Sequence, residues 1–429
     1  MVRRATCVLL GACTALLSGA ALAADSGAPL RLEDAVRFAL SRNERARISD
    51  LQVLVSEAAV EKARTAFLPA VALIGQDAQH PSVDHPPNVG STSFTVSQPL
   101  LNAPAFPLYS QAKSLADAQR AQNVDDKRLL AFNAASAFFG VLNAGKILEA
   151  AQRQLEMARA NLADTQARVQ AQLNSSNDVT RTVVDMASSE RQVEVAKGNL
   201  DAAYVQLAFT INAPVSGTLV APEPTLHAAE QPVTAIDTLV RFAQEHRPDA
   251  LVARHAAAGA HHFADEPLLR VVPTLGLQGQ VTGTTNTPPA TGRWNDETVT
   301  ATLTWTLYDA GQRYADKHSR DAQAAISDLS LVALARNVDA QVRSTVALLV
   351  SAQATFYVTE QAMSAARLSV DETAILYRQG LAKAIELVDA NDQRFTAEVN
   401  YVSAEYGMAQ AYLNFRQALG LDPLGTELR

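Results

Sequence analysis

The chain has 429 residues, of which 36 are basic and 44 acidic, and its formal net charge is −8. This acidic balance, without a block of lysine and arginine, does not indicate a nucleic-acid-binding protein. After residue 23 no run of about 20 apolar residues occurs, so the sequence predicts no transmembrane helix. A membrane β-barrel stays open as an interpretation, because each of its strands needs only about ten alternating residues.

Residues 1–23 have the pattern of a signal peptide. Arg3 and Arg4 precede an apolar run over 5–17, and the small-residue sequence Ala21-Leu22-Ala23 is typical of a cleavage site. We therefore expect the protein to be exported and the mature chain to begin near Ala24.

Both cysteines, Cys7 and Cys13, lie in this signal. The sequence at 10–13 loosely resembles a lipoprotein cleavage box at Cys13, but it would leave an apolar region of about six residues, which is short for a signal. The mature chain is therefore expected to lack disulfides. Its stability must come from burial or from assembly with other chains.

The rest of the chain contains one unit twice. The sequence Val-Arg-Phe-Ala occurs at 36–39 and again at 240–243, and Pro69 is matched by Pro273 at the same spacing. Each unit is far longer than a solenoid repeat, so we interpret the units as duplicated structural halves.

Each half is predicted to contain helix, two strands and a long helical hairpin. For the first structural repeat, 24–213, we expect a helix at 32–67, strands at 70–77 and 92–99, and a helical hairpin at 105–212, with helices at 105–172 and 178–212. Prolines at 214, 222, 224 and 232 mark a connector at 214–233. For the second structural repeat, 234–429, we expect helices at 234–246 and 248–264, strands at 273–282 and 298–307, and a helical hairpin at 312–421. The sequence Asp265-Glu266-Pro267 is expected to end the second of these helices early.

Heptad spacing of apolar residues indicates that both hairpins pack as coiled coils. In the second hairpin this row runs from Val338 to Tyr377 and returns from Phe395 to Leu413. Gly380 lies between the two rows, and glycine commonly ends a helix in the left-handed conformation. The stretch 377–389 is therefore predicted to form the tip of an arm about 100 Å long.

The clearest predicted strand is 298–307, in which threonine alternates with apolar residues. This period of two suits a barrel wall that faces lipid on one side and water on the other, although a half-buried strand of a soluble sheet has the same pattern. Trp305 and Tyr308 are placed where an interfacial aromatic belt would be. Four strands cannot close a barrel, so copies of the chain would have to pool them. Two copies would give a filled eight-stranded barrel, and three would give twelve strands and a passage.

The duplicated helix, strand-pair and long-hairpin order behind a signal peptide resembles the TolC family of outer membrane efflux and secretion channels. The residues that carry the resemblance are Pro69, Pro273 and the sequence from Tyr377 through Gly380 to Asp389. The resemblance implies a mainly α fold with a membrane β-barrel part. It also implies a homotrimer whose 12-stranded barrel in outer membrane lipid is continued by a helical barrel through the periplasm.

The same resemblance implies an exit duct, and from the residues we expect neither an enzyme nor a cofactor. Its partners would be a periplasmic adaptor and the inner-membrane transporter of a tripartite efflux pump or a type I secretion system. The transporter, rather than the duct, would choose the substrate.

The resemblance also implies roles for residues near the tip. Tyr377 matches a tyrosine that braces the closed periplasmic aperture, and Glu386 and Asp389 match two constricting acidic positions. Ala382 occupies the position of a bracing arginine in the family, with Lys383 next to it. We therefore expect Tyr377 and Lys383 to bond to neighbouring helices and hold the aperture closed.

Both hairpin tips are expected to project furthest from the membrane and to contact the adaptor. The predicted contact residues are Gln172, Leu173, Asn174 and Ser175 in the first tip and Gly380, Leu381 and Ala382 in the second.

Other interpretations of these residues remain. Glu386 and Asp389 lie on one helical face, which is also what a solvated helix surface would present. His261, His262, Asp265 and Glu266 have suitable chemistry for a metal but form one short local cluster, whereas zinc needs three or four converging ligands. The alternative function is a periplasmic coiled-coil adaptor or scaffold without a barrel. No phosphate-binding loop or catalytic motif supports an enzyme.

Overall fold

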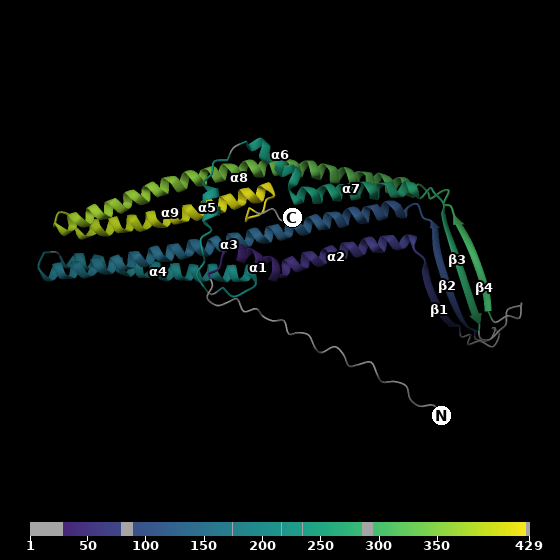
Figure 1. The fold of residues 1–429 in the computed structure, drawn as a ribbon, viewed down its shortest axis with the longest axis horizontal. Coiled ribbons are helices and arrows are strands. Elements are labelled where there is room, and N and C mark those ends of the chain that lie inside the picture. Colours follow the sequence, from purple (N-terminus) through teal and green to yellow (C-terminus); the bar gives the residue numbers. More distant parts are fainter. Residues whose placement is uncertain are drawn as a thin grey trace, which may run out of the picture.

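The computed structural model describes residues 29–78, 89–173, 175–215, 217–233, 235–284 and 295–425. Within these ranges the molecule is a long helical rod with a small sheet at one end (Figure 1). The predicted signal peptide, 1–23, and Cys13 lie outside the described residues. The mainly helical fold with a separate strand region confirms the predicted fold class.

The first half follows the predicted order of helix, strand pair and helical hairpin. Its elements are α1 (Leu32–Arg42), α2 (Glu44–Arg64), a single 3₁₀ turn (Thr65–Phe67), β1 (Ala70–Ala78), β2 (Val89–Leu101), α3 (Ala105–Gln170) and α4 (Ser176–Ile211).

The second half repeats this order. Its elements are α5 (Glu223–Ala229), α6 (Ile236–His246), α7 (Pro248–Leu269), β3 (Thr274–Thr284), β4 (Asn295–Thr304), α8 (Gln312–Arg378) and α9 (Ala384–Leu419). Helix α5 lies inside the predicted proline-rich connector, where Pro224 at its second residue suits the first turn of a helix.

The continuous helix predicted at 32–67 is wrong, because the chain breaks at Asn43. The Asn43 side chain accepts a hydrogen bond from the Arg45 amide at 2.9 Å and so caps α2. Its amide nitrogen also donates to the Thr210 carbonyl, 2.8 Å away at the end of α4. This break anchors the start of α2 to the first helical hairpin.

The expected early end of the helix at 265–267 is also wrong, since α7 runs through Pro267 to Leu269. Proline has no amide proton and leaves the carbonyl four residues earlier without its helical partner. Here Arg320 of α8 donates to that carbonyl, on Phe263, at 3.0 Å. Glu266 accepts from Arg320 at 2.5 Å and from Arg270 at 2.9 Å. Contacts from α8 therefore stabilise a helical turn that the local sequence disfavours.

The four strands form one antiparallel sheet in the order β1-β2-β3-β4. Its register places apolar residues together on one face, in rows such as Val71, Val96, Gly279 and Val299 or Leu73, Phe94 and Val281, and the second of these rows continues to Glu297 on β4. The opposite face carries rows of polar residues, such as Thr95, Gln280 and Thr298 or Ser97, Gln278 and Thr300. The apolar face is exposed in the single chain, with Val299 79% exposed.

Strand β4 ends earlier than the predicted 298–307. Its last residue is Thr304, and the Trp305 indole nitrogen donates to the Val271 carbonyl at 3.0 Å just beyond the strand. Trp305 and Tyr308 are both exposed in this segment. These side chains therefore lie where the sheet passes into the helical rod.

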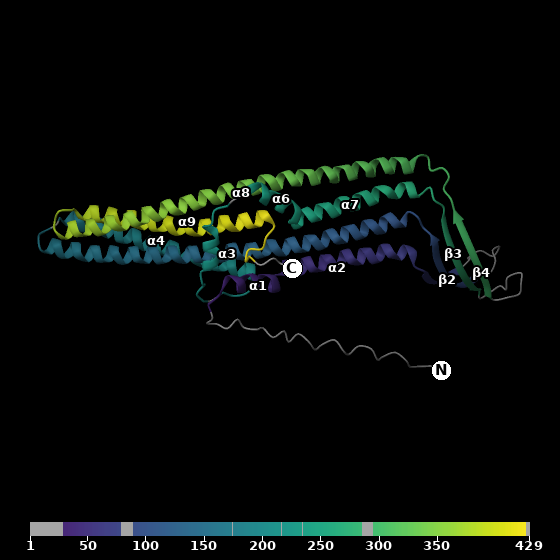
Figure 2. The same ribbon diagram turned by 45° about the horizontal axis from the view of Figure 1, so that its top comes forward.

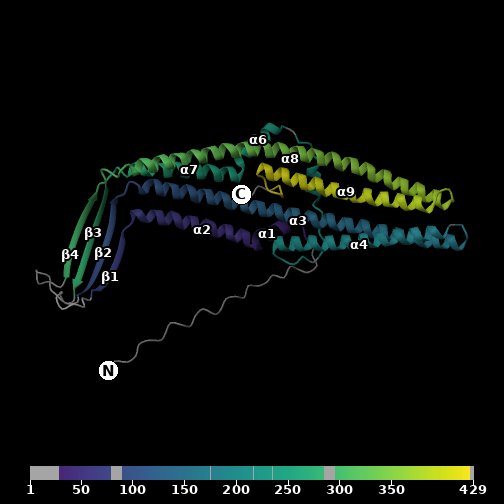
Figure 3. The same cartoon turned by 180° about the vertical axis from the view of Figure 1, so that it is seen from behind.

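The hydrophobic core lies midway along the rod, where α1, α5 and α6 gather beside the long helices (Figure 2). One cluster joins α1, α3, α4 and α9 around Phe138, Leu207 and Leu413. A second joins α6, α8 and α9 around Val342, Leu349 and Met408. From this middle region the α3–α4 and α8–α9 hairpins extend together to the end opposite the sheet (Figure 3).

Candidate functional site

Both helical hairpins end in the same type of turn. Gln172 and Gly380 have φ of 61° and 75°, the left-handed conformation that ends many helices. In each turn the next amide bonds back five residues, from Leu173 to the Arg168 carbonyl and from Leu381 to the Leu376 carbonyl, both at 2.9 Å. The turns therefore present Leu173 and Leu381 to solvent, and each is 73% exposed.

The remaining predicted tip residues surround these leucines. Ser175 caps α4 by accepting from the Asn177 amide at 3.2 Å, and the Asp178 carboxylate accepts from the Ser175 amide at 3.2 Å. Ala382 is half-buried next to Leu381. Asn174 lies outside the described residues.

Tyr377, at the last turn of α8, joins the two hairpins. It is only 4% exposed and packs with Ala384 and Leu387 of α9. Its hydroxyl lies 3.3 Å from the Thr165 hydroxyl of α3, and either group can donate. Tyr377 therefore holds the end of α8 to α3 within one chain.

Arg168 of α3 is the second part of this contact. Its guanidinium carbon lies 4.3 Å from the centre of the Tyr377 ring, within the range of a cation–π interaction. Its Nη1 donates to the Tyr377 carbonyl at 3.1 Å, and its Nε donates to Asp164 at 2.9 Å. We call Asp164, Thr165, Arg168 and Tyr377 the tip lock.

Arg168 was not predicted from the sequence, because the resemblance placed the bracing arginine of the family at Ala382, on the other hairpin. A signal was present, since an arginine in the last turn of a helix often reaches a nearby carbonyl. Lys383, the expected substitute, is exposed at the start of α9, and its side chain makes no hydrogen bond or ion pair within the described ranges.

Glu386 and Asp389 lie in the first two turns of α9 with exposed side chains. Leu387 between them packs into the cluster around Tyr377, whereas the two acidic residues are exposed. Acidic groups at a helix N-terminus are favoured by the helix dipole. Both residues therefore belong to an exposed acidic surface of the single chain.

Further acidic residues extend from this surface towards α4. Partial burial raises the pKa of Asp392, and the charge of Asp389 raises it further. Burial raises the pKa of Asp185 on α4 to about 6, with the charge of Asp392 as the second cause. Gln154 of α3 donates to Asp392 at 3.1 Å. A band of carboxylates therefore runs from α9 to α4 near the tip.

The histidine and acidic cluster near the end of α7 is occupied by other contacts. His261 lies 3.0 Å from Asp328 of α8, and Glu266 is bound by arginines. Among the described residues, no three histidine, cysteine, aspartate or glutamate side chains are grouped to hold a metal ion.

Within the described ranges, none of the helices has the length and apolarity to cross a membrane. The molecule instead combines an apolar-faced sheet with two long hairpins that are locked together at their tips. An antiparallel sheet joined to two long helical hairpins is the mainly α fold class that the sequence predicted.

Comparison with known proteins agrees with this class. Residues 239–421 match the family of outer membrane efflux proteins. The chain is 23% identical to outer membrane protein TolC of Escherichia coli (strain K12) over 346 residues, which cover 78% of this chain and 70% of TolC.

Solved structures share the fold over nearly the whole chain. The CusC structure has a TM-score of 0.79 at 15% identity and covers 91% of this chain and 92% of CusC. The open-state outer membrane channel MtrE of Neisseria gonorrhoeae has a TM-score of 0.79 at 18% identity and covers 93% of this chain and 91% of MtrE. The similarity to outer membrane efflux proteins therefore includes sequence over the second half of the chain and fold over nearly all of it.

Proposed function

We propose that three copies of this chain assemble into one duct that carries substrates out of the cell. The observation that carries this proposal is the sheet: its outer strands, β1 and β4, have one strand neighbour each among the described residues. Open strand edges are not tolerated in lipid, so these edges must pair with further copies. Twelve pooled strands leave a passage, whereas eight would be filled by side chains.

The exposed leucines at the two tips support docking of a periplasmic adaptor. Leu173 and Leu381 are displayed by equivalent turns at the end furthest from the sheet, so a trimer would present six such side chains. A partner with helical tips could insert between them. An inner-membrane transporter, of either a tripartite pump or a type I secretion system, would complete the assembly.

The tip lock supports a closed resting aperture. Because Arg168 and Tyr377 join the α8–α9 hairpin to α3, they oppose any outward movement of that hairpin. Glu386 and Asp389 would form a ring of six carboxylates in a trimer, and a ring of carboxylates favours cations. Such a ring repels itself, so closure falls to the tip lock.

The test is the resting conductance of the purified protein in planar lipid bilayers. Arg168→Ala removes the stacking, the bond to the Tyr377 carbonyl and the pair with Asp164, and should raise the resting conductance about tenfold. Arg159→Ala is the matched control, because Arg159 lies on the same helix but pairs with Glu190 in an exposed ion pair. A parent protein with the mass of a monomer in detergent, or equal conductance of both variants, would contradict the proposal.

A further inference from the structure

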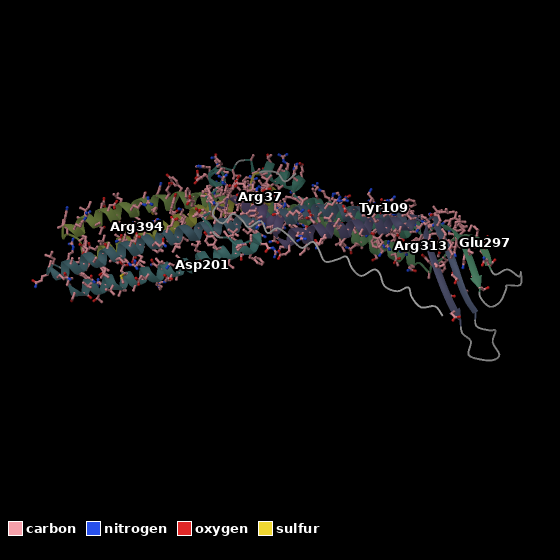
Figure 4. All side chains as sticks on the ribbon, turned by 60° about the horizontal axis from the view of Figure 1, so that its bottom comes forward. Arg37, Tyr109, Asp201, Glu297, Arg313 and Arg394 are labelled. Atoms are coloured by element: carbon pink, nitrogen blue, oxygen red, sulfur yellow. The ribbon has the colours of Figure 1, made fainter. Side chains whose placement is uncertain are left out.

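Arg394 of α9 has a charged guanidinium group whose hydrogen-bond donors are only partly paired by the surrounding protein. Its Nε and Nη2 atoms are sealed from solvent and have no hydrogen-bond acceptor among the described residues. Figure 4 shows Arg394 on the part of the helical rod that extends away from the sheet. A buried donor without an acceptor costs about 1–3 kcal/mol, and more when it is charged.

The groups that face Arg394 come from three helices. Burial lowers the pKa of Arg394, Glu398 of α9 and Asp371 of α8 oppose this, and Arg153 of α3 and Arg367 of α8 lower it further. The guanidinium group stays protonated, because its ordinary pKa is above 12. Arg394 therefore shares its surroundings with two further arginines and two carboxylates.

Glu398 is bound to Arg153, not to Arg394. Its side chain is buried, and its Oε1 accepts from Arg153 Nη2 across the contact between α3 and α9. Arg153 can exchange this ion pair for solvent or another carboxylate more easily than the buried Glu398 can replace it. Its side chain is 46% exposed, and Glu149, one turn earlier on α3, lies 4.0 Å away.

Arg394 and Glu398 are four residues apart on one helix, the spacing at which side chains form an ion pair. If Glu398 turned to Arg394, the orphan donors would gain an acceptor, and Arg153 could pair with Glu149 or with water. From this competition we infer that Glu398 is a two-position switch, which holds α3 to α9 when bound to Arg153 and releases α9 when bound to Arg394.

The switch lies between the tip lock and the middle of the rod. With Glu398 on Arg153, an ion pair here adds to the tip contact at Tyr377 and to the Gln154–Asp392 hydrogen bond in holding the α8–α9 hairpin to α3. With Glu398 on Arg394, this ion pair is lost and only the tip contact and that hydrogen bond hold the outer part of the hairpin. The two positions exchange one charged pair for another, so a small bias from a docked partner is enough to change their populations. The inference rests on the proposed gating function and adds a second contact to it.

The experiment compares the channel conductance of two variants, Arg153→Ala and Arg394→Ala. If the two arginines only stabilised the fold, both substitutions would change the conductance in the same direction. Arg153→Ala leaves Glu398 only Arg394, and should raise the resting open fraction in bilayers about tenfold. Arg394→Ala leaves Arg153 as the only partner of Glu398. When it is combined with Arg168→Ala, the resting conductance should be about tenfold lower than that of Arg168→Ala alone. Arg394→Lys keeps a cation one turn from Glu398 and should restore most of that conductance. Arg159→Ala is again the control and should change nothing.

A second measurement does not depend on channel activity. The two native cysteines, Cys7 and Cys13, lie in the predicted signal peptide, so a pair introduced elsewhere is free of competing thiols once that segment is removed. The side chains of Gln154 and Asp392 are hydrogen-bonded across α3 and α9, and Gln154→Cys with Asp392→Cys reports on their separation by disulfide formation. Cross-linking should be slower with Arg153→Ala and faster with Arg394→Ala.

The outcomes separate this inference from the proposed function. Opposite effects of the two arginine variants support the switch. Effects of the same sign, or none, overturn it even if Arg168→Ala opens the channel. If the parent forms no channel, the proposed function fails, and the cross-linking rates alone then support or overturn the switch.

Discussion

Arginine substitutions on the two faces of β4 give a direct test of which face meets lipid. Val299 lies near the middle of β4 on the apolar face, opposite Gly279, and Thr300 lies on the polar face, opposite Gln278. Arginine on the lipid face costs about 2–4 kcal/mol at the bilayer midplane and about 0–1 kcal/mol near the interface. Val299→Arg should therefore destabilise each chain by about 2–4 kcal/mol, and Thr300→Arg should be nearly neutral.

The position of Leu303 adds an internal control. It shares the apolar face with Val299 but lies one residue from the end of β4, so Leu303→Arg should cost about 1 kcal/mol. The measurement is urea-induced unfolding from lipid vesicles, followed by the fluorescence of the two tryptophans, Trp294 and Trp305. Equal destabilisation by Val299→Arg and Thr300→Arg would refute the assignment of the faces, because it would remove the distinction between lipid and lumen.

Three further predictions concern the helical rod. Burial raises the pKa of Asp185 to about 6, so the folded state binds the extra proton and stability rises as pH falls from about 6 towards 4. Asp185→Asn should therefore stabilise the rod by about 1–3 kcal/mol at pH 7.5 and have no effect below about pH 4, in chemical denaturation followed by circular dichroism. Gly420→Ala should lower the free energy of unfolding more than Gly380→Ala does in the same assay. Both glycines have positive φ, where an alanine is destabilised by about 1 kcal/mol. Only at position 420 would the added Cβ also lie 2.9 Å from Arg247 Cγ. Glu386→Gln with Asp389→Asn should lower cation selectivity in single-channel recordings without opening the pore. Unchanged selectivity would show that the two residues form no ring and lie on a solvated helix surface.

Periodic patterns were sufficient to predict the main architecture. The alternation in 298–307 identified β4, and the heptad row that ends at Tyr377 identified α8, because both depend only on residues close together in the sequence. The positions that sequence reasoning misjudged depend on distant partners. Pro267 stays inside α7 because Arg320 binds the free carbonyl, and helix α2 is anchored at Asn43 by Thr210.

The candidate site shows the same limit. Tyr377 and the two tips were predicted from the sequence, but Arg168, which stacks on Tyr377, comes from a helix more than 200 residues earlier. No local pattern connects the two residues. The expected role of Lys383 stays a prediction about contacts between copies of the chain.

The duplicated halves explain why such contacts are hidden from sequence comparison. Asn43 and Arg247 occupy equivalent helix junctions, and each donates to a carbonyl at the end of its own return helix, to Thr210 at 2.8 Å and to Ala418 at 2.9 Å. The hydrogen bond is kept while the residue has changed from a neutral amide to a buried cation. The longer arginine side chain fills the space where a Cβ at position 420 would lie, so the second half requires glycine there. The equivalent turn of the first half has Asn212 at φ 49°, and its side chain donates to the Arg42 carbonyl at 3.2 Å. Each half therefore preserves the geometry of the junction through its own set of compensating residues, and the repeat is clearer in structure than in sequence.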